Sequence, residues 1–365
     1  MSYHVVSAPV SLRGHPLRLV GLGVVLASYA CAPDTPTGPA MEPASAPDAA
    51  ITYTVVRLGA LGGIDGEASD MVDGRMAGYA ETADGRFHAF LWQNGSMQDL
   101  GALPNSVLTS SRAMALNSVG QVVGFSLTNV AGGGSTDHAF LWQNGTMLDL
   151  GTLGGTDSRA FGINDAGVIV GFARNAGGNE RAVRWRNGAI QSLGTLGGPT
   201  SAAIGINASG AIVGRSQNSQ GKFRAFVWRN GTMRALPALA DGDFAQADAI
   251  NISGQIVGAA VTKSGFQHAV LWTDGQIQDL GVLTGDTESV AQDIDDAGRI
   301  TGFSWRNTAN GTVTRVFLWE KGVLRNLGNS AGKPNRALGI APAGHLVGSS
   351  TENGDQIAVL WRRGP

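Results

Sequence analysis

Hydrophobic residues along this chain occur in short runs of five or six residues, separated by turns rich in glycine, asparagine and aspartate. One stretch shows the pattern well, with such runs at residues 159–164, 168–173, 181–185 and 189–193. No segment carries a convincing 3.6-residue period over ten or more residues, which an amphipathic helix would require. Short apolar runs between turn residues are typical of β-strands, so this stretch predicts four strands.

The four-strand unit recurs through the chain, and tryptophan marks its position. Seven of the eight tryptophans lie 42–50 residues apart: Trp92, Trp142, Trp185, Trp228, Trp272, Trp319 and Trp361. A glycine follows each of these tryptophans three residues later. A self-similar period of roughly 40–50 residues with four strands per unit is typical of a β-propeller, in which each repeat forms one blade.

Two kinds of turn recur inside the unit. An Asn-Gly or Asp-Gly pair, such as Asn187-Gly188, predicts a tight hairpin between strands three and four, because both central residues of a type I′ turn need a positive φ. Between strands one and two, two glycines lie four residues apart, as in Gly167 and Gly171, and this pair occurs in all seven copies. An alanine just upstream, here Ala160, also recurs seven times.

The two ends of the repeat region complement each other. The last unit stops at its hairpin turn, residues 361–365, and residues 53–63 match the fourth strand of the other units. Sharing one sheet between both ends closes a ring and removes exposed sheet edges. For residues 51–365 we therefore predict an all-β fold, a seven-bladed β-propeller of four-stranded antiparallel blades. Its N-terminal strand, residues 53–58, completes a C-terminal blade formed by residues from about 340 to 364.

Two strings carry a family resemblance. Residues 88–92 and 138–142 both read His-Ala-Phe-Leu-Trp, and each is followed by Asn-Gly and then by Asp-Leu-Gly. In this they resemble the HAF repeat of bacterial extracellular proteins, and the resemblance covers residues 53–364. Later copies depart from the pattern, with arginine at the histidine position in Arg181, Arg224 and Arg315. The resemblance implies β-propeller-like repeats and an extracytoplasmic location, and it transfers no catalytic residue.

The first 31 residues have the features of an export signal. Arg13 and Arg18 precede an apolar run of 12 residues at 19–30, which is shorter than the roughly 20 residues that span a bilayer. Cys31 ends a string, LASYAC, that resembles a bacterial lipobox. We expect residues 1–31 to be a lipoprotein-type signal peptide with Cys31 as the lipidated residue, and simple secretion is the alternative. Residues 32–50 are rich in proline and alanine and predict a linker.

Composition and charge exclude several kinds of functional site. The chain has 365 residues, of which 54 are glycine and one is cysteine, and its formal net charge is −2. A single cysteine excludes a disulfide scaffold and a cysteine-rich metal site. A charge this close to zero gives no general basic footprint for nucleic acid. The sequence has no Ser/His/Asp set, no His-Glu-x-x-His motif and no phosphate-binding loop, so we expect no cofactor and no metal.

One repeated position carries the candidate ligand-binding residues. It lies directly before the recurring alanine, at the entry to the innermost strand of each blade. Guanidinium groups grip carboxylate or sulfate through paired donors, so arginines around a channel mouth predict a binding site. The alternative is that these residues only solvate the rim of the channel. The candidates are Glu67, Arg112, Arg159, Gln246 and Arg336.

Two further series allow a functional and a structural interpretation. His88, His138 and His268 lie four residues before a tryptophan, where they either form a ligand ring or cap the start of strand three and pack on the neighbouring blade. Asp99, Asp149 and Asp279 precede the Leu-Gly of strand four. We interpret these aspartates as solvating and protecting the outer strand edge.

Loop lengths indicate which face binds a ligand. The turns between strands one and two and between strands three and four are nearly constant, whereas the other connections, on the opposite face, vary in length. We expect a monomeric, non-catalytic scaffold of the cell envelope that binds a glycan, peptide or protein on this variable-loop face. Its membrane contact is the lipid anchor alone, and it has no nucleic-acid partner. The alternative is a propeller-type glycan lyase or hydrolase at the channel mouth, where Glu67 is the one acid of the rim.

Overall fold

The computed structural model describes residues 5–6, 24–25, 51–104, 109–129, 134–239, 242–309, 311–328 and 335–364. Two short strands, β1 (Val5–Val6) and β2 (Val24–Val25), pair with each other. The rest of the predicted signal peptide, Cys31 and the linker at 32–50 lie outside the described residues. Within the described ranges, no helix is long and apolar enough to cross a membrane.

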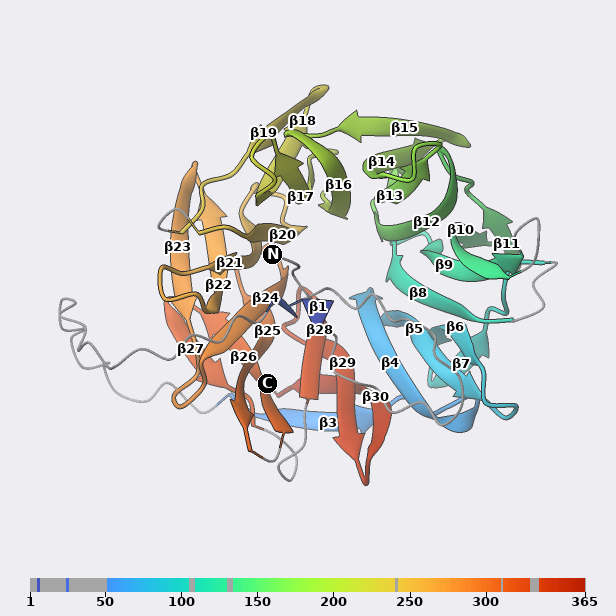
Figure 1. Cartoon of the computed structure of the whole chain (residues 1–365). Coiled ribbons are helices and arrows are strands. Elements are labelled where there is room, and N and C mark those ends of the chain that lie inside the picture. Colours follow the sequence, from blue (N-terminus) through green and yellow to red (C-terminus); the bar gives the residue numbers. More distant parts are fainter. Residues whose placement is uncertain are drawn as a thin grey trace.

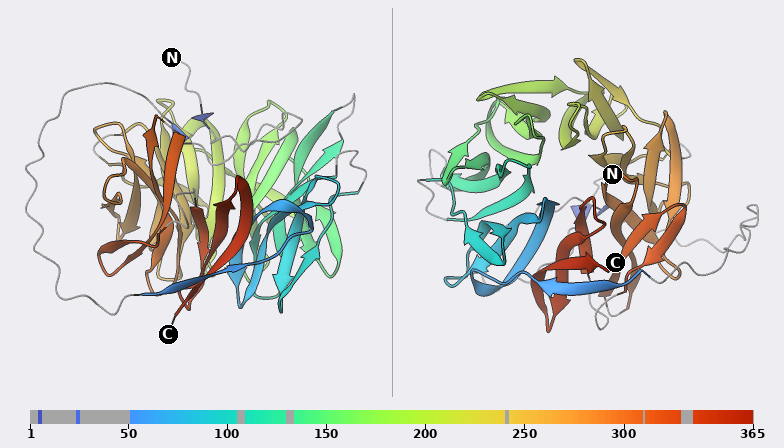
Figure 2. Two further views of the ribbon diagram at one scale, coloured as in Figure 1. Left: turned by 90° about the horizontal axis from the view of Figure 1, so that it is seen from below. Right: turned by 180° about the vertical axis from the view of Figure 1, so that it is seen from behind.

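Seven antiparallel sheets of four strands stand in a ring, which confirms the prediction of a seven-bladed β-propeller (Figure 1). We number the blades in chain order, and in each blade strand one lies nearest the axis of the ring (Figure 1). Figure 2 shows the ring from its edge and from behind, with the sheets packed side by side around the axis. Because consecutive strands are antiparallel, the turns between strands one and two and between strands three and four share one face of the ring.

The first four blades follow one another without interruption. Blade 1 holds β4 (Gly62–Val72), β5 (Arg75–Thr82), β6 (Phe87–Gln93) and β7 (Ser96–Asp99). Blade 2 holds β8 (Ser111–Leu116), β9 (Val122–Asn129), β10 (Ser135–Gln143) and β11 (Thr146–Asp149). Blade 3 holds β12 (Gly154–Ile163), β13 (Ile169–Asn175), β14 (Glu180–Arg186) and β15 (Ala189–Gly194). Blade 4 holds β16 (Gly197–Ile206), β17 (Ile212–Asn218), β18 (Phe223–Arg229) and β19 (Thr232–Ala235).

The last three blades complete the ring, and the chain returns to its beginning in blade 7. Blade 5 holds β20 (Ala245–Ile250), β21 (Ile256–Val261), β22 (Gln267–Thr273) and β23 (Gln276–Gly281). Blade 6 holds β24 (Glu288–Ile294), β25 (Ile300–Thr308), β26 (Gly311–Glu320) and β27 (Val323–Asn326). Blade 7 holds β28 (Asn335–Ile340), β29 (Leu346–Glu352), β30 (Asp355–Arg363) and β3 (Tyr53–Arg57).

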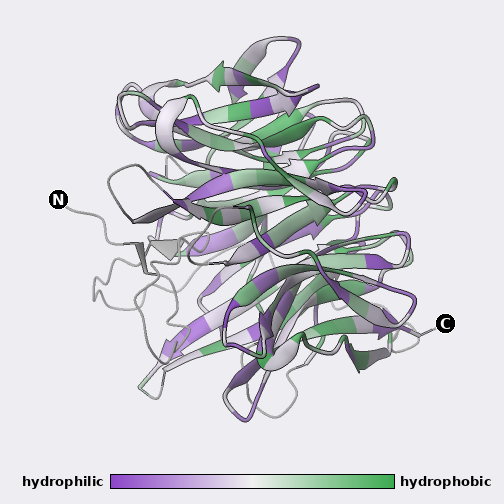
Figure 3. Cartoon of the chain, turned by 90° about the vertical axis from the view of Figure 1, so that its right-hand side faces the viewer, coloured by the Kyte–Doolittle hydropathy of each residue, from purple (hydrophilic) through white to green (hydrophobic). Residues whose placement is uncertain are grey.

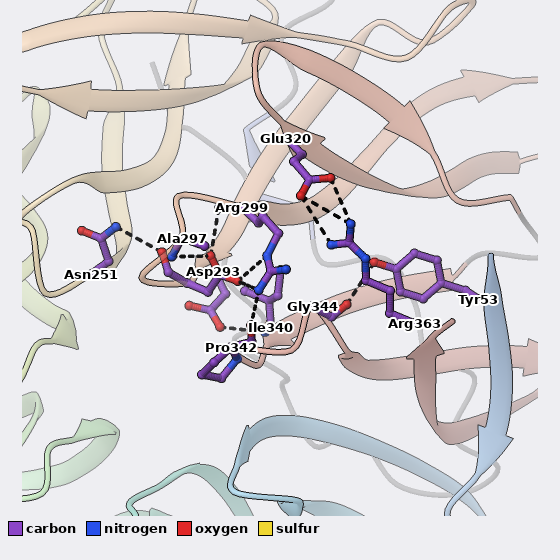
Figure 4. Close-up of polar contacts among 11 residues, drawn as sticks. Tyr53, Asn251, Asp293, Ala297, Arg299, Glu320, Ile340, Pro342, Gly344 and Arg363 are labelled. Carbon is purple, nitrogen blue, oxygen red and sulfur yellow. Dashed lines mark hydrogen bonds and ion pairs between the residues drawn. The ribbon is translucent and has the colours of Figure 1, made fainter. Parts of the chain in front are cut away.

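The ring closes through β3, which pairs with β30 from Tyr53↔Arg363 to Arg57↔Val359. Blade 7 begins at Asn335, five residues before the predicted boundary. Figure 4 shows how side chains support this closure: the Tyr53 hydroxyl donates to the Gly344 carbonyl at 3.0 Å, and Arg363 pairs with Glu320 of blade 6 at 3.3 Å. The predicted sharing of one sheet between both ends of the repeat region is therefore confirmed.

The hairpin turns adopt the predicted backbone conformation. Asn94, Asn144, Asn187, Asn230 and Asp274 have φ angles of 50–52°, and the glycine after each of them also has a positive φ. Both central residues thus match a type I′ turn, whose twist suits the flanking strands. Gly154 and Gly155, which follow strand four of blade 2, already belong to β12 of blade 3.

Tryptophans fill the spaces between blades, as the repeat predicts. Trp185 and Trp272 are each 1% exposed, and the indole N–H of Trp185 donates to the Leu150 carbonyl of the preceding blade at 2.9 Å. The recurring alanines, such as Ala160, are fully buried because neighbouring blades approach closely there. Figure 3 shows hydrophobic residues along the strands and hydrophilic residues between them and at the turns. The two faces of each blade are therefore covered by the two neighbouring blades.

The second glycine of the repeated pair is required by a backbone contact. A β-bulge follows Ala160 in strand one, and similar register shifts occur in the other six blades. Opposite this bulge, a Cβ atom placed on Gly171 would lie 1.9 Å from the Arg159 carbonyl oxygen. No side chain fits at that distance, which explains why glycine recurs in all seven copies of the repeat.

A belt of asparagines joins consecutive blades on the face of the short turns. Asn117, Asn164, Asn207 and Asn251 each donate from Nδ2 to the backbone carbonyl at the same position of the next blade, at 2.9–3.2 Å. These asparagines are 2–7% exposed, and an unpaired amide at such a site would be costly. Arg299 continues the belt to the Pro342 carbonyl of blade 7 (Figure 4). The sequence interpretation did not identify this belt.

The side chains of His88, His138 and His268 each bond to an aspartate on strand four of their own blade. The His138 Nδ1 atom lies 2.7 Å from Asp149, and the same contact joins His88 to Asp99 and His268 to Asp279. Asp149 also accepts from the Gly151 backbone amide at 2.8 Å, which fixes the connection to the next blade. The aspartates therefore do more than solvate an edge. The histidines hold strand four against strand three.

We expect Gly171→Ala to destabilise the fold by about 3 kcal/mol, because the added methyl group must displace the bulged backbone of β12. Gly177→Ala is the matched control in the same blade, since its Cβ would meet only ordinary contacts at 3.4 Å and beyond. Urea unfolding of both variants measures the difference. Equal stability of the two variants would contradict the steric explanation.

The His138–Asp149 pair predicts a pH-dependent contribution to stability. The hydrogen bond to Asp149 raises the pKa of His138. Burial would raise the pKa of Asp149, but the bonds from His138 and Gly151 outweigh it, and the net direction is down. The raised histidine pKa stabilises the fold below its unfolded value of about 6.5, and this is lost as pH rises through the folded pKa. The lowered aspartate pKa stabilises the fold above the unfolded value of about 4, and this contribution is lost as pH falls through the folded pKa.

Asp149→Asn keeps an acceptor for Gly151 but removes the charge beside His138. The free energy of unfolding, compared with that of the unmodified chain, should fall more between pH 4 and 6 than above pH 8. An NMR titration should show the pKa of His138 moving down, while His345, which lies in blade 7, titrates unchanged. A loss of stability that is the same at all pH values would rule out the charge contribution.

Candidate functional site

The five candidate residues occupy one equivalent position on the inner strands. Each of them contacts a strand-two residue of the blade that precedes it in the ring: Arg112 contacts Tyr79, Arg159 contacts Phe125, Gln246 contacts Arg215, Arg336 contacts Phe303, and Glu67 contacts Ser349. These side chains therefore lie in the seams between blades. Arg112, Gln246 and Arg336 lie at the start of strand one, toward the face of the variable connections, whereas Glu67 and Arg159 lie midway along β4 and β12.

Arg112 lies between two aromatic rings of blade 1. Its guanidinium carbon lies 4.2 Å from the centre of the Tyr79 ring and 5.4 Å from that of Phe87. The two rings meet edge to face, with centroids 5.6 Å apart. A cation over an aromatic face gains roughly 0.5–2 kcal/mol, depending on how far it is desolvated. The guanidinium group of Arg112 therefore contacts both rings.

Glu67 is held in the closing seam by three donors. Its carboxylate accepts from the Tyr79 hydroxyl at 3.3 Å, from Ser349 at 2.9 Å and from the Gln356 amide at 2.6 Å. The residue is 9% exposed. Ser349 and Gln356 belong to blade 7, so this side chain joins the last blade to the first. Nearby, Asp65 accepts from the Gln356 backbone amide at 2.8 Å.

Tyr79 connects these residues into one cluster. Burial raises the pKa of its hydroxyl above the ordinary value, and the Glu67 charge raises it further, whereas Arg112 and Arg336 act in the opposite direction. All three charged groups therefore lie close enough to act on one phenol. We call Glu67, Tyr79, Arg112 and Arg336 the rim cluster. It spans blades 7, 1 and 2.

The other two candidates lie apart from the rim cluster. Arg159 pairs with Asp137 at 2.5 Å and stacks over Phe125 at 4.6 Å, so its charge is already matched. Gln246 lies in blade 5, where it accepts from Arg215 at 3.0 Å and donates to Asp248 at 2.6 Å. Burial raises the pKa of Asp248 to about 7, against the bond from Gln246 and the charge of Arg215. The structure thus brings three of the five candidates together and separates two.

The aromatic partners were missed in the sequence, although a signal for them exists. An aromatic residue follows the second repeat glycine at Tyr79, Phe125, Phe172 and Phe303. In three of these four cases the next blade carries arginine before its recurring alanine. Blade 4 breaks the pattern with Ala202. Residues about 33 positions apart thus vary together because they meet across a seam.

The rim cluster offers hydrogen-bond donors to a ligand. Arg112 and Arg336 have no carboxylate partner among the described residues, so their donors can serve an anionic group. In the same described ranges, no group of three or more His, Cys, Asp or Glu residues is placed to hold a metal ion. The predicted variable loops near this face lie partly outside the described residues, at 105–108, 130–133 and 310.

Comparison with known proteins supports the fold and goes no further. Neither the family models nor the curated proteins give a match. Among solved structures, the chain is similar to a puromycin hydrolase mutant (15% identity, TM-score 0.50), covering 79% of this chain and 50% of that one. It is also similar to an acylaminoacyl peptidase from Pyrococcus horikoshii (13% identity, TM-score 0.50, 80% and 49% covered) and to TolB from Acinetobacter baumannii (12% identity, TM-score 0.44, 80% and 64% covered). The chain spans about half the length of the hydrolase and of the peptidase, and it shares the β-propeller fold with them.

Proposed function

We propose that this protein is an exported, lipid-anchored β-propeller that acts as a non-catalytic binding scaffold. Its ligand is a glycan, peptide or protein that presents an anionic group to the rim cluster. The observation that carries the proposal is the surroundings of the Arg112 and Arg336 side chains. Both guanidinium groups are oriented by aromatic rings, and neither has a carboxylate partner in the part of the chain that the structure describes.

Stacking of this kind prepares an arginine for recognition. A free arginine side chain loses rotamer freedom when it binds, whereas one already held against a ring loses less. The guanidinium edge then forms paired, charge-assisted hydrogen bonds with a carboxylate, sulfate or phosphate. The Tyr79 hydroxyl and the Glu67 carboxylate lie beside these donors and contribute polar groups for the rest of the ligand.

Export and anchoring rest on the sequence. Arg13, Arg18 and the apolar run at 19–30 support a signal peptide, and Cys31 supports a lipid anchor. The His-Ala-Phe strings support the same location through the resemblance to bacterial extracellular repeats. A linker at 32–50 would hold the propeller away from the membrane surface.

The double variant Arg112→Gln, Arg336→Gln tests the binding site. Binding of an anionic hit from a glycan or peptide array should weaken by about tenfold or more, because a neutral amide cannot form charge-assisted pairs. Arg362→Gln is the control, since Arg362 is exposed on the last strand of the chain. Unchanged binding by the double variant, or an array without any anionic hit, would refute the proposal.

Glu67→Gln separates binding from the alternative of a glycan lyase or hydrolase. We expect the substitution to lower the free energy of unfolding by about 1–3 kcal/mol, because an amide puts a donor where Tyr79, Ser349 and Gln356 all donate. Thermal unfolding and an assay of polysaccharide cleavage measure both properties. Cleavage by the unmodified chain that Glu67→Gln abolishes, at unchanged stability, would favour the enzyme.

A further inference from the structure

Charge is distributed very unevenly among the blades, although the net charge of the chain is only −2. Blades 3 and 4, residues 154–235, contain ten Arg or Lys and three Asp or Glu, a net charge of +7. The remaining repeat region, residues 51–153 and 236–365, contains 14 basic and 22 acidic residues, a net charge of −8. The two basic blades are neighbours in the ring, so their charges form one sector (Figure 1).

Within this sector, the arginines of the outer strands have no acidic partner. Arg186 ends β14, Arg229 ends β18, and Arg234 lies on β19, the outermost strand of blade 4. All three are exposed, and none of their side chains forms a hydrogen bond or ion pair with any described residue. Arg184 is covered differently, since it stacks over Trp228 at 4.8 Å across the seam between the two blades.

The described residues also form a polar hollow of about 320 Å³ beside Arg229. It lies on the face of the short turns, between blades 4 and 5. Turn residues Asn207, Ser209, Asn230 and Ser253 contribute to its lining, and Arg229 is the one charged residue in the wall. A volume near 300 Å³ is at the lower end of the range for ligand pockets, roughly 300–1,000 Å³. Hydroxyl and amide groups around one arginine suit a hydroxyl-rich ring that carries an acidic group.

We propose that this basic sector binds an acidic polysaccharide along the outer strands of blades 3 and 4. Arg186, Arg229 and Arg234 contact its carboxylate or sulfate groups, and the hollow receives one acidic sugar beside Arg229. The preference for arginine over lysine, nine to one within residues 154–235, favours groups that accept paired hydrogen bonds. The sector shares no residue with the rim cluster, so each of the two proposals is tested independently of the other.

Two other anionic partners fit the sector less well. A lipid surface is held by exposed apolar side chains that insert beside the basic ones, and single-stranded nucleic acid stacks on exposed aromatic rings. Every residue of 154–235 is described, and none of the large hydrophobic residues that are exposed on the protein lies in that range. Blades 3 and 4 therefore offer charge and hydrogen bonds without an exposed large hydrophobic residue, and the hollow beside Arg229 is bordered by a single one, Ile252 of blade 5, which is 53% exposed.

The test compares two triple variants of the full chain. Arg186→Gln, Arg229→Gln, Arg234→Gln removes the free charges of the sector. Lys263→Gln, Lys321→Gln, Arg362→Gln removes three exposed charges from blades 5, 6 and 7 and gives the same net charge. Binding to immobilised polygalacturonate and to dextran sulfate is measured at increasing NaCl concentration, with neutral dextran as the uncharged polymer.

We expect the sector variant to bind at least one acidic polymer about tenfold more weakly, with a shallower salt dependence, since fewer counterions are released. The control variant should bind as the unmodified chain does, and neutral dextran should not bind. The proposal is overturned if both triple variants lose affinity equally, or if the unmodified chain binds neither polymer. It is also overturned if duplex DNA or phosphatidylglycerol vesicles bind more tightly than the polymers.

Discussion

The pairing of β3 with β30 is the interaction on which the rest of this structure depends. A single four-stranded blade cannot bury its own apolar faces, and it is stable only between two neighbours. The five residue pairs of this closing ladder give blades 1 and 7 the neighbours that they would otherwise lack. Tryptophans such as Trp185, the asparagine belt and the rim cluster all cross from one blade to the next, and the rim cluster crosses the seam between blades 7 and 1 that this pairing creates.

The closing seam differs from the other six in its chemistry. Elsewhere the short turns are joined by asparagine amides or by the guanidinium groups of Arg75 and Arg299. Between blades 7 and 1, acidic side chains take this role nearer the variable face, where Asp65 and Glu67 accept from Gln356. Glu67 occupies a position that holds arginine in three other blades, so the same position is acidic here and basic on either side. A nearly regular repeat thus acquires a distinct polar site where its ends meet.

Much of the fold was predictable because its determinants are local or repeated. Asn187-Gly188 specifies a turn by its own backbone preferences, and the incomplete last repeat specifies the closing strand. The contacts of the site are of another kind. That Arg112 meets Tyr79 depends on which strands of different blades become neighbours and on how they twist. The basic sector was hidden for a simpler reason, since a sum of −2 over the chain conceals +7 in two adjacent blades.

The place where the ring closes also determines whether the chain can be circularly permuted. The Gly364 amide donates to the Thr52 carbonyl at 2.8 Å, so the two ends of the propeller lie within one hydrogen bond of each other. A short loop could join them without disturbing β3 or β30, and new ends could then be opened at an exposed hairpin such as Asn187-Gly188. Circular permutants of this kind would carry the same seven blades, with the junction of first and last moved away from Glu67. A closed ring of blades has no first blade, so the order of the blades is set by the sequence of the chain alone.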